Sequence, residues 1–281
     1  MTTPTVLLVH GVRASATMWR AQLRALRAAG VPALAPDLPG HGARAGEAFT
    51  VERALATLDD AAGAVGGPVV VVGLSMGGYL ALHWAARTGR PAAVLAASCC
   101  TRPAGPPLWA YRRLAGAIAR LPDGGARLGE VLARRALPAQ ALADVNAGGM
   151  SVGVMDAVLA GLAHIDPLAD LRAVAVPVWL VNGRWDHFRT QERRFLRQCA
   201  AGRLVVVPGA SHLVSLVRPV AFNRVLLELV DTVGARPTPT AGPGAALPAP
   251  ARAPGPVRPV SPARRRPGAA RGAAAPRPPG R

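Results

Sequence analysis

Ser75 stands in the G-L-S-M-G pattern of residues 73–77, directly after the four consecutive valines Val69–Val72. The valines are typical of a buried strand, and the residues from Gly78 onward have the composition of a helix. A serine on a tight strand-to-helix turn projects its Oγ into a pocket while its backbone faces a helix N-terminus. Glycines flank such a serine because the two backbones nearly touch there. The pattern therefore predicts Ser75 as a nucleophile.

A serine hydroxyl needs a base to accept its proton and a third group to orient that base. Of the six histidines, His212 is best placed, because it follows the last expected strand in the segment Pro208–His212. Asp186 follows the preceding strand, in Asn182–Asp186. Parallel strands end at the same edge of a sheet. We therefore expect Ser75, Asp186 and His212 to meet, in the chain order Ser…Asp…His that such a sheet uses.

Other residues compete for these two roles. His187 adjoins the candidate acid, but we expect its side chain to point elsewhere. His83 lies on the helix after the nucleophile and is expected to pack, whereas His164 lies in a segment that could face the substrate. Asp166 and Asp156 are the alternative acids. All five stay open as candidates at this point.

Acyl transfer also needs N–H donors directed at the developing oxyanion. The backbone N–H of Met76, just after the nucleophile at the start of the helix, is one candidate. The other is the N–H of Val12, in a loop after the first strand where Gly11 allows a tight bend. His10 in the same loop is expected to stabilise the loop and not to act as a catalyst.

Short apolar runs alternate with helical patterns along the chain. The expected strands are Thr5–Val9, Ala33–Ala35, Val69–Val72, Ala93–Ala97, Val178–Val181 and Leu204–Val207. The expected helices between them are Trp19–Ala29, Val51–Val65, Gly78–Thr88 and Thr190–Ala200. Nearly continuous apolar strands are covered on both faces. The alternation predicts an α/β fold with a doubly wound, mostly parallel sheet of about six strands and helices on both faces.

The alternation stops once, from Arg102 to about Arg172, where no convincing strand appears. Helical patterns are present instead, at Leu108–Ala119, Ala126–Leu137 and Val152–His164. A helical insertion between two parallel strands is expected to form a cap over the strand ends, where ligands bind. We therefore expect a core of residues 1–101 and 173–233, a cap of residues 102–172, and a tail of residues 234–281.

The cap is rich in Ala, Leu and Arg, which favours a small substrate with a mostly apolar acyl group. Trp109, Tyr111 and Met155 are candidates for lining its pocket. Arg102 or Arg13 would then meet a polar end of the substrate. Each of these residues could equally serve in plain helix packing.

Charge and composition bound the remaining functions. The 281 residues carry a net charge of +18, and all 33 basic residues are Arg. Nine arginines and no acidic residue follow Gly234, so half of this excess belongs to the tail. The tail is almost entirely Pro, Ala, Gly and Arg, so we expect it to be disordered. Its Arg264–Arg266 run could contact an anionic partner, but we expect a solvated tail and no specific nucleic-acid partner.

Several classes of protein are disfavoured. A segment that spans a bilayer needs a run of about 18 apolar residues, and the sequence contains no such run. The first residues, Met1–Pro4, lead straight into a strand without a basic segment or a cleavage site, so we expect a cytoplasmic protein. The three cysteines, Cys99, Cys100 and Cys199, have no disulfide or metal spacing and are expected to be buried thiols. No cofactor or metal is expected, and the oligomeric state stays open.

With these motifs in place, the sequence resembles the α/β-hydrolase superfamily, in particular its capped, esterase-like members. The matching pieces run in family order over roughly residues 5–230: Val9–Gly11 with Trp19, Asp37–Gly42, Gly73–Gly78, Gly183 to Asp186 and Gly209 to His212. The resemblance implies Ser75 as nucleophile, Asp186 and His212 as its partners, and a nucleophile elbow with Val12 and Met76 as oxyanion donors. The family's usual opening strands are absent, so the first edge of the sheet is expected to be exposed or covered by something else.

The leading functional expectation is hydrolysis of a carboxylic ester or thioester through an acyl-enzyme, with a Ser-His-Asp triad. A C–C bond hydrolase, a lactonase or an acyltransferase on the same triad remains an alternative. A ligand-binding protein that lacks catalysis is a further alternative from a different class. The residues of the cap do not identify the substrate.

Overall fold

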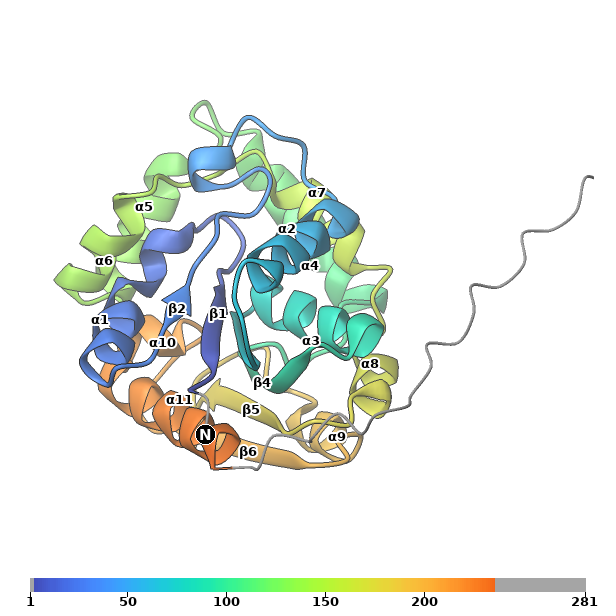
Figure 1. The fold of residues 1–281 in the computed structure, drawn as a ribbon. Coiled ribbons are helices and arrows are strands. Elements are labelled where there is room, and N and C mark those ends of the chain that lie inside the picture. The colour runs from blue at the N-terminus through green and yellow to red at the C-terminus, as the bar shows by residue number, and fades with distance from the viewer. Residues whose placement is uncertain (1–2, 236–281) are drawn as a thin grey trace, which may run out of the picture. The chain divides into compact units, whose positions relative to one another are not determined.

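The computed structural model describes residues 3–235. Six strands form one fully parallel sheet in the order β2-β1-β3-β4-β5-β6 (Figure 1). Their bounds are Thr5–Val9 (β1), Ala33–Leu34 (β2), Val69–Leu74 (β3), Pro91–Ala97 (β4), Val178–Gly183 (β5) and Gly202–Val207 (β6). The predicted fold class and the strand count are confirmed. Where the sequence indicated a mostly parallel sheet, all six of these strands are parallel.

The strand order reverses at β1. From β1 the chain moves outward to β2, and then returns to the other side of β1 to form β3. Ligands of open parallel sheets bind beyond the carboxyl ends of the strands at such a switch point. The loop after β1 and the turn after β3 therefore border the expected binding site.

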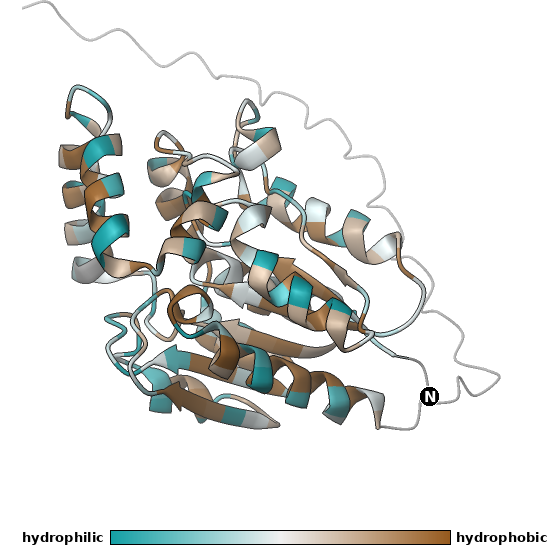
Figure 2. Cartoon of the chain, turned by 90° about the vertical axis from the view of Figure 1, so that its left-hand side faces the viewer, coloured by the Kyte–Doolittle hydropathy of each residue, from teal (hydrophilic) through white to brown (hydrophobic). Residues whose placement is uncertain are grey.

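The sheet is covered by helices on both faces, because its strands are apolar on both sides (Figure 2). Along β3, Val69 and Val71 belong to one core cluster, and Val70 and Val72 to the other. The first cluster includes buried residues of α2 (Val51–Gly63), α3 (Met76–Thr88), α8 (Pro167–Ala173) and α9 (Glu192–Leu196). The second includes residues of α1 (Arg20–Ala28), α10 (Val214–Val217) and α11 (Pro219–Gly234). This is the doubly wound arrangement that the alternating pattern predicts.

The regular elements between β4 and β5 are all helices. It contains α4 (Gly105–Ala119), α5 (Ala126–Ala136), α6 (Ala139–Asn146), α7 (Met155–Leu162) and then α8. The sequence does not indicate α6, because this helix has only eight residues and directly follows a proline. Helix α8 packs on α3 and buries Leu168 and Leu171 in the core cluster of the sheet. The boundary expected at residue 172 thus falls within a helix that is part of the sheet layers.

Two elements differ in length from the expectation. Helix α3 begins at Met76, two residues earlier than predicted, because the left-handed backbone of Ser75 ends the strand and the helix starts at once. Helix α9 covers only Glu192–Leu196 of the expected Thr190–Ala200. The last helix, α11, ends at Gly234, the first residue of the tail predicted for residues 234–281. From residue 236 onward this predicted disordered tail lies outside the described residues.

No helix of residues 3–235 is long and apolar enough to cross a bilayer. Cys99 and Cys100 are buried free thiols, and Cys199 is half-buried. Burial raises the pKa of Cys100 to about 12 and that of Cys199 to about 11, so both stay in the thiol form at neutral pH.

Candidate active site

Ser75 occupies a strained turn between β3 and α3. Its φ of 57° and ψ of −116° are unusual for a residue with a side chain, and such backbone strain concentrates at functional sites. A Cβ at Gly73 would collide with the backbone of Gly77, and a Cβ at Gly77 would collide with the carbonyl of Val9. The N–H of Ser75 donates to the carbonyl oxygen of Ala97 on β4 at 2.8 Å, which fixes the turn to the sheet.

The structure brings Ser75, His212 and Asp186 into one hydrogen-bonded series. Nδ1 of His212 lies 3.0 Å from Oδ1 of Asp186, and Nε2 lies 3.0 Å from Oγ of Ser75. An ionised carboxylate only accepts hydrogen bonds, so Nδ1 carries the proton and Nε2 is left to accept from the serine hydroxyl. This is the tautomer that a general base for Ser75 requires.

Asp186 is buried, with only 5% of its surface exposed, at the loop after β5. Burial by itself would raise the pKa of this carboxyl group. The hydrogen bond and charge of His212, together with the N–H of Phe188 at 2.8 Å, outweigh burial and hold the pKa below its usual value. Asp186 therefore stays ionised at neutral pH beside the imidazole.

Phe188 is a residue of the site that the sequence did not indicate. Its ring lies 4.9 Å from that of His212, and its N–H binds the Asp186 carboxylate. The hydroxyl of Thr101 donates to the carbonyl oxygen of Phe188 at 2.8 Å, which ties this loop to the segment after β4. An Asp whose side chain accepts from the N–H two residues later forms a common turn. The two-residue spacing between Asp186 and Phe188 is the sequence feature that could have indicated Phe188.

The two residues expected to supply oxyanion donors both lie beside Ser75. Val12 in the loop after β1 and Met76 at the first position of α3 both line the cavity that contains Ser75. Within residues 3–235, neither N–H donates a hydrogen bond to the protein. The first N–H groups of a helix lack partners inside the helix and carry partial positive charge, so they suit an anionic oxygen.

His10 stabilises the loop that carries Val12. Its Nε2 accepts from the N–H of Leu38 at 3.0 Å, and its Nδ1 lies 2.9 Å from the carbonyl oxygen of Gly11. Burial and the neighbouring His41 lower the pKa of His10 to about 4, so the ring is neutral at physiological pH. A neutral ring can donate at Nδ1 and accept at Nε2 at once, which matches the structural role expected for it.

Ser75 opens into a cavity of about 870 Å³ beneath the helices between β4 and β5. Much of its wall is aliphatic, with contributions from α5, α6, α7 and the loop before α10. Tyr111 and Met155 line it as expected, and so do Arg13 and Arg102. Trp109 does not; it is 64% exposed and borders a separate, smaller cavity beside Arg112.

The competing candidates lie elsewhere or have other partners. His83 on α3 pairs with Asp170 at 3.0 Å, and His164 is exposed and lines no part of the cavity. Asp166 caps the N-terminus of α8, and Asp156 pairs with Arg112 at 2.9 Å on the surface. His187 differs from the expectation, because its ring lies 5.0 Å from that of His212 at the cavity wall. The hydroxyl of Ser75 nevertheless contacts His212.

One group of metal-binding side chains occurs in the described part of the chain. Ligand atoms of Asp186, His187 and His212 lie within 4.8 Å of one another. Both nitrogens of His212 are already engaged with Asp186 and Ser75. A metal ion at this place would have to displace those contacts.

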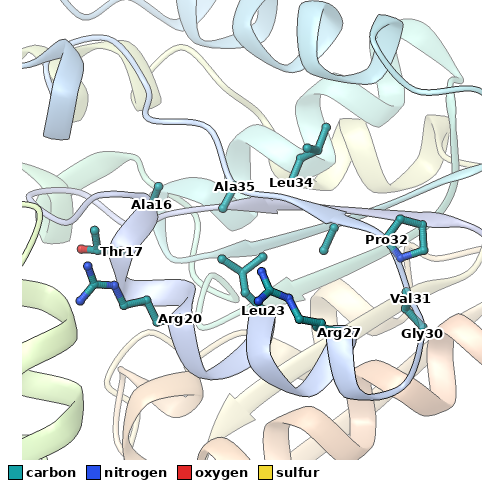
Figure 3. Close-up of a pocket in the computed structure, with 11 residues that line it drawn as sticks. Ala16, Thr17, Arg20, Leu23, Arg27, Gly30, Val31, Pro32, Leu34 and Ala35 are labelled. Atoms are coloured by element: carbon teal, nitrogen blue, oxygen red, sulfur yellow. The ribbon is translucent and has the colours of Figure 1, made fainter.

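A second cavity, of about 700 Å³, lies away from Ser75 between helix α1 and edge strand β2 (Figure 3). It includes Arg20, Leu23 and Arg27 of α1 and Leu34 of β2, whose side chain is 37% exposed. Strand β2 is an outer strand of the sheet. No histidine, cysteine or carboxylate lines this cavity, so it lacks the groups for acid–base or nucleophilic chemistry.

Comparison with known proteins agrees with this geometry. The sequence profile of the α/β-hydrolase family matches residues 6–225. The chain belongs to the α/β-hydrolase family. Its sheet has six strands within residues 3–235.

Among solved structures of this α/β-hydrolase fold, a thermophilic esterase from Thermogutta terrifontis, determined with malate bound, is 27% identical. The match covers 83% of this chain and 91% of that one, with a TM-score of 0.65. An enol-lactonase from Burkholderia xenovorans LB400 is 22% identical, with a TM-score of 0.68 over 82% of this chain and 92% of that one, and shows the fold alone.

A curated relative matches over a shorter stretch. Lipase LipV of Mycobacterium tuberculosis is 44% identical over 85 residues, which are 29% of this chain and 31% of the lipase. The match thus spans about a third of that relative's length. Together these similarities agree with membership of the α/β-hydrolase family.

Proposed function

We propose that this protein is a serine hydrolase that cleaves carboxylic esters or thioesters of small, mostly apolar substrates through an acyl-enzyme. The observation that carries the proposal is the contact of 3.0 Å between Nε2 of His212 and Oγ of Ser75, with Nδ1 of the same ring on Asp186. That series is the arrangement in which a neutral imidazole removes the proton of an attacking serine.

In the proposed reaction, Oγ of Ser75 attacks the ester carbonyl carbon as its proton moves to Nε2 of His212. The ionised Asp186 stabilises the imidazolium that forms. When the tetrahedral intermediate collapses, His212 gives that proton to the leaving alcohol or thiol. A water molecule then attacks the acyl-enzyme, with His212 as its base, and the acid and free Ser75 are released.

The oxyanion is assigned to the N–H groups of Val12 and Met76. Both line the cavity beside Ser75, and neither has a partner within the described part of the protein. Removing one such donor typically costs about 3 kcal/mol of transition-state stabilisation. Because both donors are backbone groups, the glycines and His10 that fix their loops are the residues through which they can be altered.

The helices between β4 and β5 are proposed to act as the cap over this site. They supply the aliphatic wall of the cavity above Ser75, which excludes water and fits an apolar acyl group. The esterase from Thermogutta terrifontis and the lipase from Mycobacterium tuberculosis support ester cleavage as the first activity to test. Cleavage of a lactone or C–C bond, or transfer of the acyl group to another acceptor, would use the same acyl-enzyme.

The test is hydrolysis of p-nitrophenyl esters of graded acyl length by the wild-type protein and Ser75→Ala. We expect kcat/KM for the wild type to peak at a medium chain, and the variant to lose at least about a thousandfold of it. Ser211→Ala, on the loop beside His212, is the matched control for loss of a serine and should retain activity. A flat profile with equal rates for Ser75→Ala and the wild type would refute the proposal.

A further inference from the structure

Arg13 follows the proposed oxyanion donor Val12 and lines the same cavity. Its guanidinium is not paired with a carboxylate in residues 3–235. Nη2 contacts the thioether sulfur of Met150 at 3.3 Å, which is a weak acceptor, and Nε is buried without a hydrogen-bond partner. The buried Nε leaves one donor of this half-buried guanidinium unsatisfied, and an anion beside it would accept from that donor.

The backbone of Arg13 is strained. Its φ of 67° lies in the left-handed region, which residues with side chains rarely adopt. The carbonyl oxygen of Arg13 accepts from the N–H of Ser151 at 3.2 Å, so the strained residue is tied to the segment before α7. Its guanidinium also lies close to Gly129 of α5. Two separate parts of the chain between β4 and β5 therefore lie against Arg13, residues 150–151 and Gly129.

The charge of the whole cavity is one-sided. Among the described residues that line it, three are arginines, Arg13, Arg102 and Arg194, and none is Asp or Glu. Arg102 has a distant partner, Asp166 at 3.8 Å, outside the cavity. Arg194 is exposed. Among these three arginines, Arg13 alone has a buried nitrogen without a hydrogen-bond partner in the described part of the chain, and the rest of the wall is mainly aliphatic. Such a cavity attracts an anion that is attached to an apolar body.

We propose that the substrate is an ester that bears a carboxylate on its apolar acyl chain, and that Arg13 binds this carboxylate. The inference rests on the proposed ester hydrolysis and names its substrate class. A guanidinium can form two parallel hydrogen bonds to a carboxylate, so Arg13 orients the acyl chain as well as attracting it. Arg13 is thus a specificity-determining residue, distinct from the groups that perform the chemistry.

The test compares two p-nitrophenyl esters of equal chain length. One is the neutral hexanoate, and the other is the mono-ester of hexanedioate, which ends in a carboxylate. We expect the wild type to prefer the anionic ester by at least about tenfold in kcat/KM, because a hydrogen bond to a charged group contributes that much. Arg13→Met should remove the preference, whereas Arg13→Lys should keep part of it. Arg224→Met, an equal loss of charge at an exposed residue of α11, should keep all of it.

A second readout does not need catalysis. Ser75→Ala is titrated in a calorimeter with monomethyl hexanedioate and with methyl hexanoate, and the anionic ester should bind at least about tenfold more tightly. A wild type that prefers the neutral ester, or a preference that Arg13→Met leaves unchanged, would overturn this inference while ester hydrolysis stands. If neither ester is hydrolysed, the proposed function fails, and the calorimetry still decides whether Arg13 binds the carboxylate.

Discussion

Asp186 holds His212 through a single carboxylate oxygen. Oδ1 accepts both from Nδ1 of His212 at 3.0 Å and from the N–H of Phe188 at 2.8 Å. The Phe188 N–H is a donor fixed by the backbone, so it requires an acceptor at this place whatever residue stands at 186. The imidazole is therefore oriented by a group whose own direction is set by the loop.

This relationship makes two substitutions at residue 186 differ. In Asp186→Asn, the Phe188 N–H keeps the amide oxygen at the Oδ1 place, so His212 retains its tautomer and only the charge is lost. We expect kcat to fall about a hundredfold, the worth of a charge-assisted hydrogen bond. Asp186→Ala loses orientation as well, and kcat should fall about ten-thousandfold. Hydrolysis of p-nitrophenyl butyrate measures both.

Asp156→Asn, on an exposed carboxylate that pairs with Arg112, is the control and should leave kcat unchanged. Circular dichroism checks that each variant is folded. Equal losses in Asp186→Asn and Asp186→Ala would show that the Phe188 N–H does not fix the amide.

The contact between Gly77 and Val9 leads to a prediction about stability. A methyl group at residue 77 would press on the carbonyl of β1, where the strand backbone cannot yield. Gly77→Ala should lower the free energy of unfolding by about 3 kcal/mol. Gly116→Ala, inside α4 with no neighbouring atom within 4 Å of the place its methyl group would take, should instead raise it by about 0.5 kcal/mol. Urea denaturation measures both, and similar effects at the two glycines would contradict the close approach.

The buried, neutral His10 predicts how stability depends on pH. Its pKa is lowered to about 4 from 6.5, so between these values the unfolded chain binds the proton and the folded one does not. The free energy of unfolding should thus increase with pH across this window. The part of this increase that comes from His10 is about 3 kcal/mol. In His10→Gln, the slope of unfolding free energy against pH should be shallower between pH 4 and 6.5. An unchanged slope would mean that the ring is already protonated in the folded protein.

Much of this architecture could be predicted from the sequence, because buried parallel strands are nearly continuous in apolar residues. The valines before Ser75 identify β3, and the glycines around the serine identify the turn. The proximity of Asp186 and His212 follows from a rule of topology, since each comes directly after a strand of the same parallel sheet. These inferences need only local composition and chain order.

Side-chain directions in loops could not be predicted in this way. The sequence favours a His187 that points away from the site, yet the turn that Phe188 closes on Asp186 brings the His187 ring beside His212. Trp109 is a candidate for the cavity wall by sequence, but α4 turns it outward. Both outcomes depend on tertiary contacts, which composition and periodicity do not contain.

The cytoplasmic location and the behaviour of the tail stay predictions.

The measurement that tests the account most directly is mass-spectrometric mapping of a fluorophosphonate adduct. Activated serines react with this probe, because the attack resembles acylation. We predict one adduct, on Ser75, that forms at least about a hundredfold more slowly in His212→Gln and not at all in Ser75→Ala. An unlabelled protein, or an adduct on another serine together with undiminished hydrolysis by Ser75→Ala, would contradict the account.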